Sequence, residues 1–148
     1  MIVLRNFTKT DALALQKLNH SHLSVEQVET LICEWNQKHV NGKYFEMFAI
    51  VFDENIVGMI SLYQHSTEVV SIGPEIFTPY RQKGFAREAM LYACTIAKEK
   101  GYKIVSQQIR TNNVASIALH SSLGFETSGL TYTNAKGNQV AFYLKSLV

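Results

Sequence analysis

The chain has 148 residues, with 14 Lys and Arg against 12 Asp and Glu, so its formal net charge is +2. This length is typical of one domain with a real hydrophobic core, and we expect residues 1–148 to form a single domain. The small charge lacks the broad basic footprint of a nucleic-acid-binding protein. The N-terminus lacks a signal peptide, and no apolar run approaches the ~20 residues of a membrane helix. We therefore expect a cytoplasmic protein with no nucleic-acid or membrane partner.

The two cysteines, Cys33 and Cys94, are far apart and lack metal-ligand spacing. We expect them to be free thiols in a reducing compartment. Four of the histidines are dispersed and form no metal-binding pattern, so no metal site is expected. They are His20, His22, His39 and His65.

The first third of the chain predicts a strand followed by two helices. A weak apolar alternation over residues 1–7 indicates the strand, and Thr10 and Asp11 can cap the first helix. Ser24 and Gln27 have the spacing of a capping box ahead of the second helix. That helix is expected to bury one face, made of Val25, Val28, Leu31, Ile32 and Trp35.

A hairpin and a further strand follow. Residues 46–52 and 56–63 are apolar on both faces, so we place these two strands in the interior of a sheet, with a turn at 53–55. Residues 69–77 predict a fourth strand. Because Pro74 has no N–H to donate, this strand is expected to be irregular or unpaired there.

The second half of the chain alternates helices and strands. Residues 87–100 predict a helix that ends at Gly101, and residues 103–109 predict a fifth strand. After one more helix, residues 125–133 and 139–145 predict a last hairpin. This order of elements is typical of a mixed α/β sheet.

A short basic loop, Arg81-Gln82-Lys83-Gly84-Phe85-Ala86, joins the fourth strand to the next helix. Backbone N–H groups at a helix start lack intrahelical partners, and the helix dipole adds positive potential there. Gly84 lets a ligand approach closely because it has no Cβ, and Arg81 and Lys83 add charge. The loop favours phosphate binding, although its pattern alone also fits an ordinary solvated turn.

A second motif, N-x-x-S-x-x-L-H-x-x-L-G-F, spans residues 113–125, and its glycine, Gly124, suits the position just after a helix. The two motifs, in this order, resemble those of the GCN5-related N-acetyltransferase (GNAT) family. The family's loop reads Q/R-x-x-G-x-G/A, and its later helix reads N-x-x-A/S-x-x-L-Y-x-x-L-G-F. The close match covers residues 69–125, and the combination is far more specific than either motif alone.

The resemblance implies an α/β fold with a mixed, mostly antiparallel sheet, splayed fourth and fifth strands, and about four flanking helices. It also implies acetyl-CoA as co-substrate, with its pantetheine arm in the gap between those strands. Ile76 and Phe77 would bond the arm through their backbones, and the loop 81–86 would hold the pyrophosphate. Asn113 and Ser116 would flank the arm, although both also suit simple capping roles.

Acetyl transfer to an amine needs a base, because an alkylamine of pKa ~10 is mostly protonated at neutral pH. In the family branch that acetylates ribosomal protein N-termini, a glutamate base stands where this chain has Gln108, which can only orient a water or the amine. His120 replaces a tyrosine proposed as the acid; it suits acid or base catalysis, or it is a packed helix histidine. Glu75 is the best replacement base if burial raises its pKa, and otherwise a solvated strand carboxylate.

The sequence therefore predicts an acetyl-CoA-dependent N-acetyltransferase acting on a primary amine of a small molecule or a protein. The departures at Gln108 and His120 keep open a second interpretation, an acyl-CoA-binding sensor or regulatory module without turnover. The acceptor is not readable from the sequence, and residues 10–39 and the last hairpin would select it. Many members of the family pair as homodimers, and the oligomeric state of this chain stays open.

Overall fold

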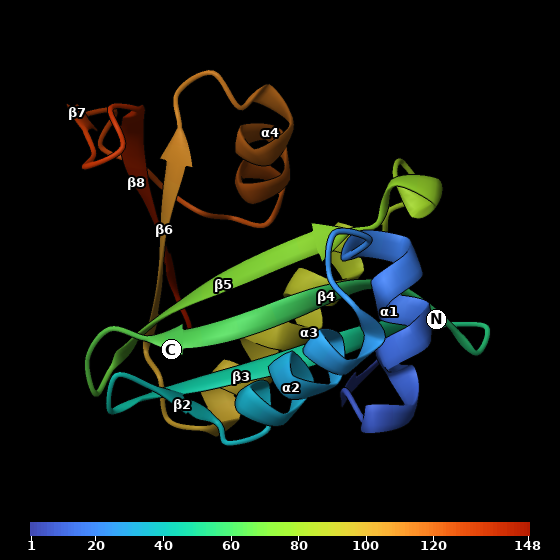
Figure 1. The fold of residues 1–148 in the computed structure, drawn as a ribbon. Helices are drawn as coiled ribbons and strands as arrows, with labels where there is room; N and C mark the ends of the chain where they lie inside the picture. Colours follow the sequence, from blue (N-terminus) through green and yellow to red (C-terminus); the bar gives the residue numbers. More distant parts are fainter.

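The computed structural model describes residues 1–148 as one mixed sheet flanked by four α-helices (Figure 1). The strands are β1 (Val3–Asn6), β2 (His39–Val40), β3 (Lys43–Phe52), β4 (Asn55–Gln64), β5 (Val69–Ile76), β6 (Ile104–Arg110), β7 (Thr131–Thr133) and β8 (Gln139–Ser146). The helices are α1 (Ala12–Asn19), α2 (Val25–Trp35), α3 (Phe85–Glu99) and α4 (Val114–Ser122), with short 3₁₀ turns at Lys9–Asp11 and Thr78–Tyr80. None of the helices is long and apolar enough to cross a membrane.

The sheet runs in the order β1-β3-β4-β5-β6-β8-β7, with the short β2 paired to β3. Every neighbouring pair is antiparallel except β5 with β6. This arrangement confirms the expected mixed, mostly antiparallel α/β fold.

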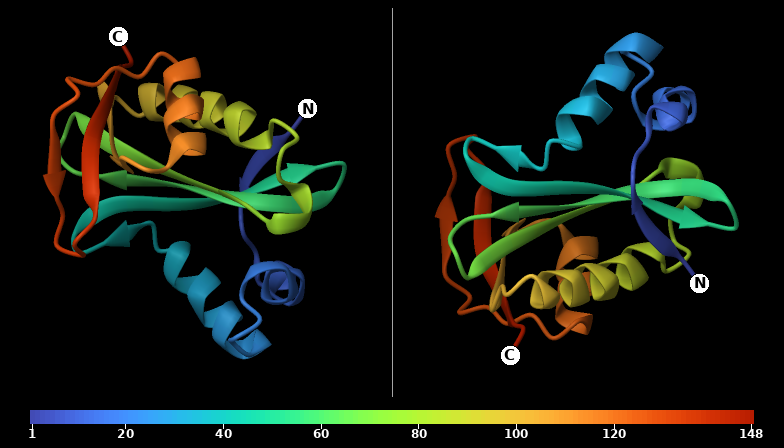
Figure 2. Two further views of the ribbon diagram at one scale, coloured as in Figure 1. Left: turned by 90° about the horizontal axis from the view of Figure 1, so that it is seen from above. Right: turned by 90° about the horizontal axis from the view of Figure 1, so that it is seen from below.

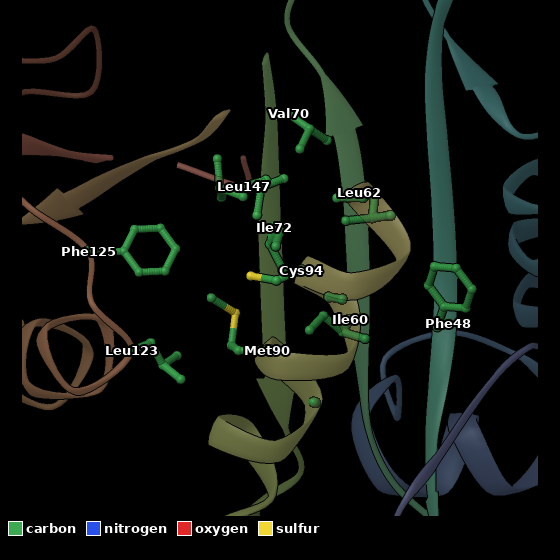
Figure 3. Close-up of a cluster of buried hydrophobic side chains, with 14 of the residues drawn as sticks. Phe48, Ile60, Leu62, Val70, Ile72, Met90, Cys94, Leu123, Phe125 and Leu147 are labelled. Atoms are coloured by element: carbon green, nitrogen blue, oxygen red, sulfur yellow. The ribbon is translucent and has the colours of Figure 1, made fainter. Parts of the chain in front are cut away.

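The helices form a layer on each face of the sheet. Figure 2 shows α1 and α2 on one face and α3 and α4 on the other. The larger apolar cluster packs α3 and the end of α4 against the sheet, and Figure 3 shows Met90 and Cys94 of α3 lying over Ile72 and Ile60. A smaller cluster packs Val28 and Ile32 of α2 against the opposite face. The sheet is therefore buried on both sides over its central strands.

The capping box predicted for α2 is confirmed. The N–H of Gln27 donates to Ser24 Oγ (3.1 Å), and the N–H of Ser24 donates to Gln27 Oε1 (2.8 Å). Each side chain thus satisfies a backbone donor that the start of a helix leaves free.

The predicted central hairpin is also confirmed, with β3 and β4 lying inside the sheet between β1 and β5. Its turn is tight because Asp53 and Glu54 both take positive φ angles, 50° and 66°. Two such residues match the twist of a hairpin, and after glycine the short side chains of Asp and Asn tolerate this region best.

The predicted strand over residues 125–133 is wrong for most of its length. Only β7 (Thr131–Thr133) pairs with β8, and upstream a single bridge joins Glu126 to Leu144. Gly129, at a φ of +81°, lies between these two pairings. A glycine in this conformation does not continue a strand, so the segment before β7 runs as an irregular connection.

The expected irregularity at Pro74 holds on one side of β5 only. Pro74 pairs in register with Ile60 of β4, so the ladder on that side continues without interruption. On the other side, β5 has no partner strand at this position, and the missing N–H of Pro74 breaks no hydrogen bond there.

Candidate active site

The strands β5 and β6 part soon after they meet. Their parallel pairing comprises only Val69 with Ile104 and Val70 with Val105. Beyond these pairs, β6 swings away toward β8 and β7, and α4 lies beside the opening, as Figure 1 shows. This is the splay that the fold prediction placed between the fourth and fifth strands.

One cleft of about 730 Å³ opens into the splay beside the starts of α3 and α4. Most of the residues predicted to bind the cofactor line it together, although they come from three separate segments of the chain. The predicted site residues in its lining are Glu75, Ile76, Arg81, Gln82, Gly84, Phe85, Ala86, Asn113 and Ser116.

The loop before α3 presents its backbone to this cleft. Glu88 N–H donates to the carbonyl of Gly84 (3.2 Å), and the N–H groups of the first turn, before Glu88, have no intrahelical acceptor. Gly84 has a φ of +83°, and a Cβ there would meet no atom within 4 Å. Gln82 also has a positive φ of 64°, which is costly for a residue with a side chain, and strained residues of this kind recur in turns and at ligand sites.

These features fit a diphosphate. Free N–H groups at the start of a 15-residue helix and a glycine facing open space provide a cradle for an anion. Arg81 lines the cleft, and its Nε donates to the carbonyl of Ile76 (2.9 Å), which fixes the guanidinium at the end of β5. Lys83 is exposed and lies outside the lining residues, so it contributes charge from the rim.

Phe77 is placed differently from its neighbour Ile76. Its side chain is fully buried at 1% exposure in the core beneath α1 and α2. Its N–H donates to Val57 (2.9 Å), and its carbonyl accepts the N–H of Tyr80 (2.8 Å). The backbone of Phe77 is thus already paired within the protein, whereas Ile76 lines the cleft.

The start of α4 faces the same cleft. Asn113 is the N-cap, since its Oδ1 accepts the N–H of Ser116 (3.1 Å). This bond uses the carbonyl oxygen of the side chain and leaves its amide donors for other partners. After the helix, Gly124 takes a φ of +83°, which confirms the predicted stop.

His120 is a packed residue with both ring nitrogens in contact. Its side chain is 3% exposed; Nδ1 lies 2.7 Å from the carbonyl oxygen of Ser116, and Nε2 lies 3.2 Å from Nε2 of Gln107. The carbonyl only accepts and the amide nitrogen only donates, so Nδ1 carries the proton and the ring is neutral. Burial lowers the pKa of His120, against the opposing effect of the Ser116 carbonyl. This environment disfavours the proton-donating form that an acid catalyst requires.

A second cavity, of about 690 Å³, lies between β5 and β6. It shares Pro74 and Ser116 with the first cleft and continues past Ser71, Gln108 and Phe142. The exposed Gln108 donates from Nε2 to the hydroxyl of Tyr132 (2.5 Å), so β7 fixes its position. The side chains of Gln107 and Gln108 project to opposite faces of β6, and both residues line this cavity, so the cavity reaches both faces of the sheet.

A smaller cavity of about 390 Å³ extends this side beyond Gln108. Its lining includes Arg110, Asn134, Lys136 and Asn138, and it contains no carboxylate. The structure thus brings part of the last hairpin, as expected, next to the predicted site.

Glu75 is half-buried on β5, with its side chain on the opposite face of the sheet from that of Ile76, since successive strand residues alternate. Its carboxylate lies close enough to His20, at the end of α1, to favour the protonated imidazole, although burial dominates and lowers the pKa of His20. Nδ1 of His20 is buried and has no hydrogen-bond partner.

Sequence reasoning missed Gln107 and His20. Gln107 lies between Val105 and Ile109, which are both core residues on the same face of β6. A polar residue at an inward position of an apolar alternation was the available signal. His20 becomes noticeable only when the fold brings the end of α1 close to β5.

The chain matches the family model of the Acetyltransferase (GNAT) domain over residues 2–126. It therefore belongs to the GNAT acetyltransferase family, whose members use acetyl-CoA as co-substrate.

Among known proteins, it is similar to the SPbeta prophage-derived uncharacterized N-acetyltransferase YokL of Bacillus subtilis strain 168, with 34% identity over 99 residues. That match covers 65% of this chain and 56% of the relative, so it spans little more than half of the relative's length.

Two solved structures share the fold at low sequence identity. The ribosomal L7/L12 alpha-N-protein acetyltransferase RimL, in complex with coenzyme A, has a TM-score of 0.84 at 17% identity, covering 98% of this chain and 93% of that one. Mutant forms of the spermidine/spermine N-acetyltransferase SpeG from Vibrio cholerae have a TM-score of 0.77 at 17% identity, covering 99% and 95%.

Proposed function

We propose that this protein is an N-acetyltransferase that transfers the acetyl group of acetyl-CoA to a primary amine. The observation that carries the proposal is the opening through the sheet. The cleft with the phosphate cradle shares Pro74 and Ser116 with the cavity between β5 and β6, and that cavity reaches both faces of the sheet. Such an opening lets a thioester held on one face meet an amine that enters from the other.

Acetyl-CoA supplies an activated acyl thioester when it is bound. The free N–H groups at the start of α3, with Gly84 and Gln82, are placed to hold its diphosphate, and Arg81 adds charge. The amide of Asn113 and the hydroxyl of Ser116 lie where they would flank the arm. Of the two backbone contacts expected on β5, the proposal keeps Ile76 and drops Phe77, whose groups are paired within the protein.

We assign proton removal from the amine to Glu75 and the positioning of the amine or a water to Gln108. Among the residues that line the cleft beside the phosphate loop, Glu75 is the only one with a carboxylate, and its side chain projects to the face of β5 opposite that of Ile76. Gln108 cannot accept a proton, but Tyr132 fixes it at the edge of the second cavity. His120 has no part in proton transfer in this proposal, because it is buried, neutral and hydrogen-bonded at both nitrogens.

The charges near Gln108 bear on the acceptor. RimL and SpeG are named for a protein N-terminus and for polyamines, respectively. In this chain the cavities on the acceptor side contain Arg110 and Lys136 and no carboxylate. We propose an amine acceptor that carries an anionic group, such as an acidic peptide N-terminus or an amino acid, because a polycation would be repelled there.

Calorimetric titration of the protein with acetyl-CoA and with CoA tests the cofactor site. We expect saturable one-to-one binding, weakened about a hundredfold or more in Gly84→Asp, since the new carboxylate would face the diphosphate. Gly42→Asp is the matched control, because Gly42 also has a positive φ of +77° and an added Cβ there would meet no atom within 4 Å, but it lies in the β2–β3 turn.

Equal affinity in the two aspartate variants would refute the assignment of the cradle. Tight binding with no thiol release over a broad amine panel would instead favour the sensor interpretation over catalysis.

A further inference from the structure

The vertex of the splay is closed by a side chain. If the β5–β6 ladder continued in register, Ser71 would pair with Ser106 and then Ile72 with Gln107. Instead, the side-chain amide of Gln107 accepts the N–H of Ile72 at Oε1 (2.8 Å) and donates from Nε2 to the carbonyl of Ile72 (2.6 Å). One glutamine therefore satisfies both backbone groups that the diverging strand would otherwise leave free.

His120 fixes the orientation of this amide. The second proton of Gln107 Nε2 points to Nε2 of His120, and Nδ1 of His120 is anchored on the carbonyl of Ser116. Gln107 and His120 are 6% and 3% exposed, yet both line the cavity at the vertex. A buried amide with every partner in place is a rigid element, because any rotation leaves polar groups unpaired.

Between Ile72 and the phosphate loop, few backbone groups of β5 remain free to bind a ligand. Residues two apart in a strand direct their backbone groups to the same side, so Pro74 and Ile76 face the gap as Ile72 does. Pro74 has no N–H, and the carbonyl of Ile76 accepts from Arg81. An arm entering from the phosphate loop thus finds the N–H of Ile76 and then the carbonyl of Pro74 before it reaches Gln107.

We propose that Gln107, held by His120, is the floor of the slot between β5 and β6 and restricts the transferred group to short acyl chains such as acetyl. The inference rests on the proposed function, because it requires the acyl end of the thioester to point toward the vertex. The floor acts by volume: the Gln107 side chain occupies the space that a longer chain would need.

The test compares the dissociation constants of hexanoyl-CoA and acetyl-CoA by calorimetry, so that no acceptor needs to be known. In Gln107→Ala we expect the ratio of the two constants to move at least about tenfold in favour of hexanoyl-CoA, since added methylenes gain a buried site. Gln107→Met is the matched control: it keeps the side-chain length without the amide, and its ratio should stay near that of the wild type.

An unchanged ratio in Gln107→Ala overturns the floor, even if both thioesters bind more weakly. A ratio in Gln107→Met equal to that of Gln107→Ala also overturns it, because hydrogen bonding rather than volume would then set the limit. Thermal unfolding monitors the fold, and Gln107→Asn, which is one methylene shorter, provides the same test if the alanine variant does not fold. A wild type that binds neither thioester refutes the proposed function itself, whereas one that binds both equally well refutes only the floor.

Discussion

The two sides of the splay present different chemical groups: backbone N–H groups on one side and polar side chains on the other. On the cofactor side, the groups aimed at the cleft are mainly backbone N–H groups at the start of α3, with a glycine at a positive φ. On the acceptor side, they are side chains, such as Gln108 held by Tyr132, and Arg110 beside Lys136. A backbone cradle should tolerate changes in most side chains, whereas we expect substitutions on the proposed acceptor side to change its selectivity. Mutations should therefore separate the two sides.

The largest effect on catalysis, as distinct from cofactor binding, is expected from Glu75→Gln. Loss of the base should lower kcat about a hundredfold at neutral pH, and less at high pH, where more of the amine is already neutral. Affinity for acetyl-CoA should stay unchanged, because the side chain lies on the face opposite that of Ile76. Initial rates across a pH series, with calorimetry alongside, measure both quantities.

Glu68→Gln is the control for that experiment, since Glu68 is an exposed carboxylate just before β5 that pairs with Lys103 at 3.7 Å. Wild-type kinetics of Glu75→Gln at every pH would remove Glu75 from the mechanism and leave the cofactor assignment intact.

A smaller effect is expected from Arg110→Gln and Lys136→Gln. Each should raise KM for an anionic amine up to about fivefold, as expected for exposed charge pairs, and leave KM for a neutral amine unchanged. Steady-state kinetics with paired acceptors at low and high salt would show it, since salt screens the wild-type preference. Lys98→Gln, in the last turn of α3, controls for the loss of one positive charge. A wild-type preference for polyamines would contradict the proposed acceptor class.

The smallest effect is a pH dependence of stability. Burial holds the pKa of His120 below 6.5, so the unfolded chain takes up a proton that the folded chain resists. The free energy of unfolding should therefore be level above about pH 6.5 and decrease as the pH falls below it. His20 has the same direction of shift and adds to the slope.

Urea unfolding of His120→Gln and His20→Gln between pH 5 and pH 8 separates the two contributions. Each variant should show a shallower pH dependence than the wild type, with His120→Gln also less stable at neutral pH because Gln107 loses its partner. An undiminished slope in both variants would mean that other groups cause the acid sensitivity.

Local sequence patterns predicted the main elements around the cleft beside α3. The loop 81–86 and the start of α4 are each contiguous in sequence, and their geometry follows from helix starts, caps and glycines within a few residues. The Ser24–Gln27 capping box, the central hairpin and the stop at Gly124 are predictable for the same reason. The irregular segment before β7 was not predictable in this way, because its pairing depends on contacts with β8 rather than on its own apolar alternation.

Other features were decided only by the tertiary structure. The Gln107 side chain bonds to Ile72, 35 residues away, and to His120, 13 residues away, so no local pattern contains this arrangement. The same contacts turn His120 from a candidate acid into a neutral buried partner. The sequence by itself determined the family, the position of the loop 81–86 and the order of most elements, because these depend on neighbours along the chain. Which polar side chains are free to react was set by burial and by distant hydrogen-bond partners, which exist only once the sheet has formed.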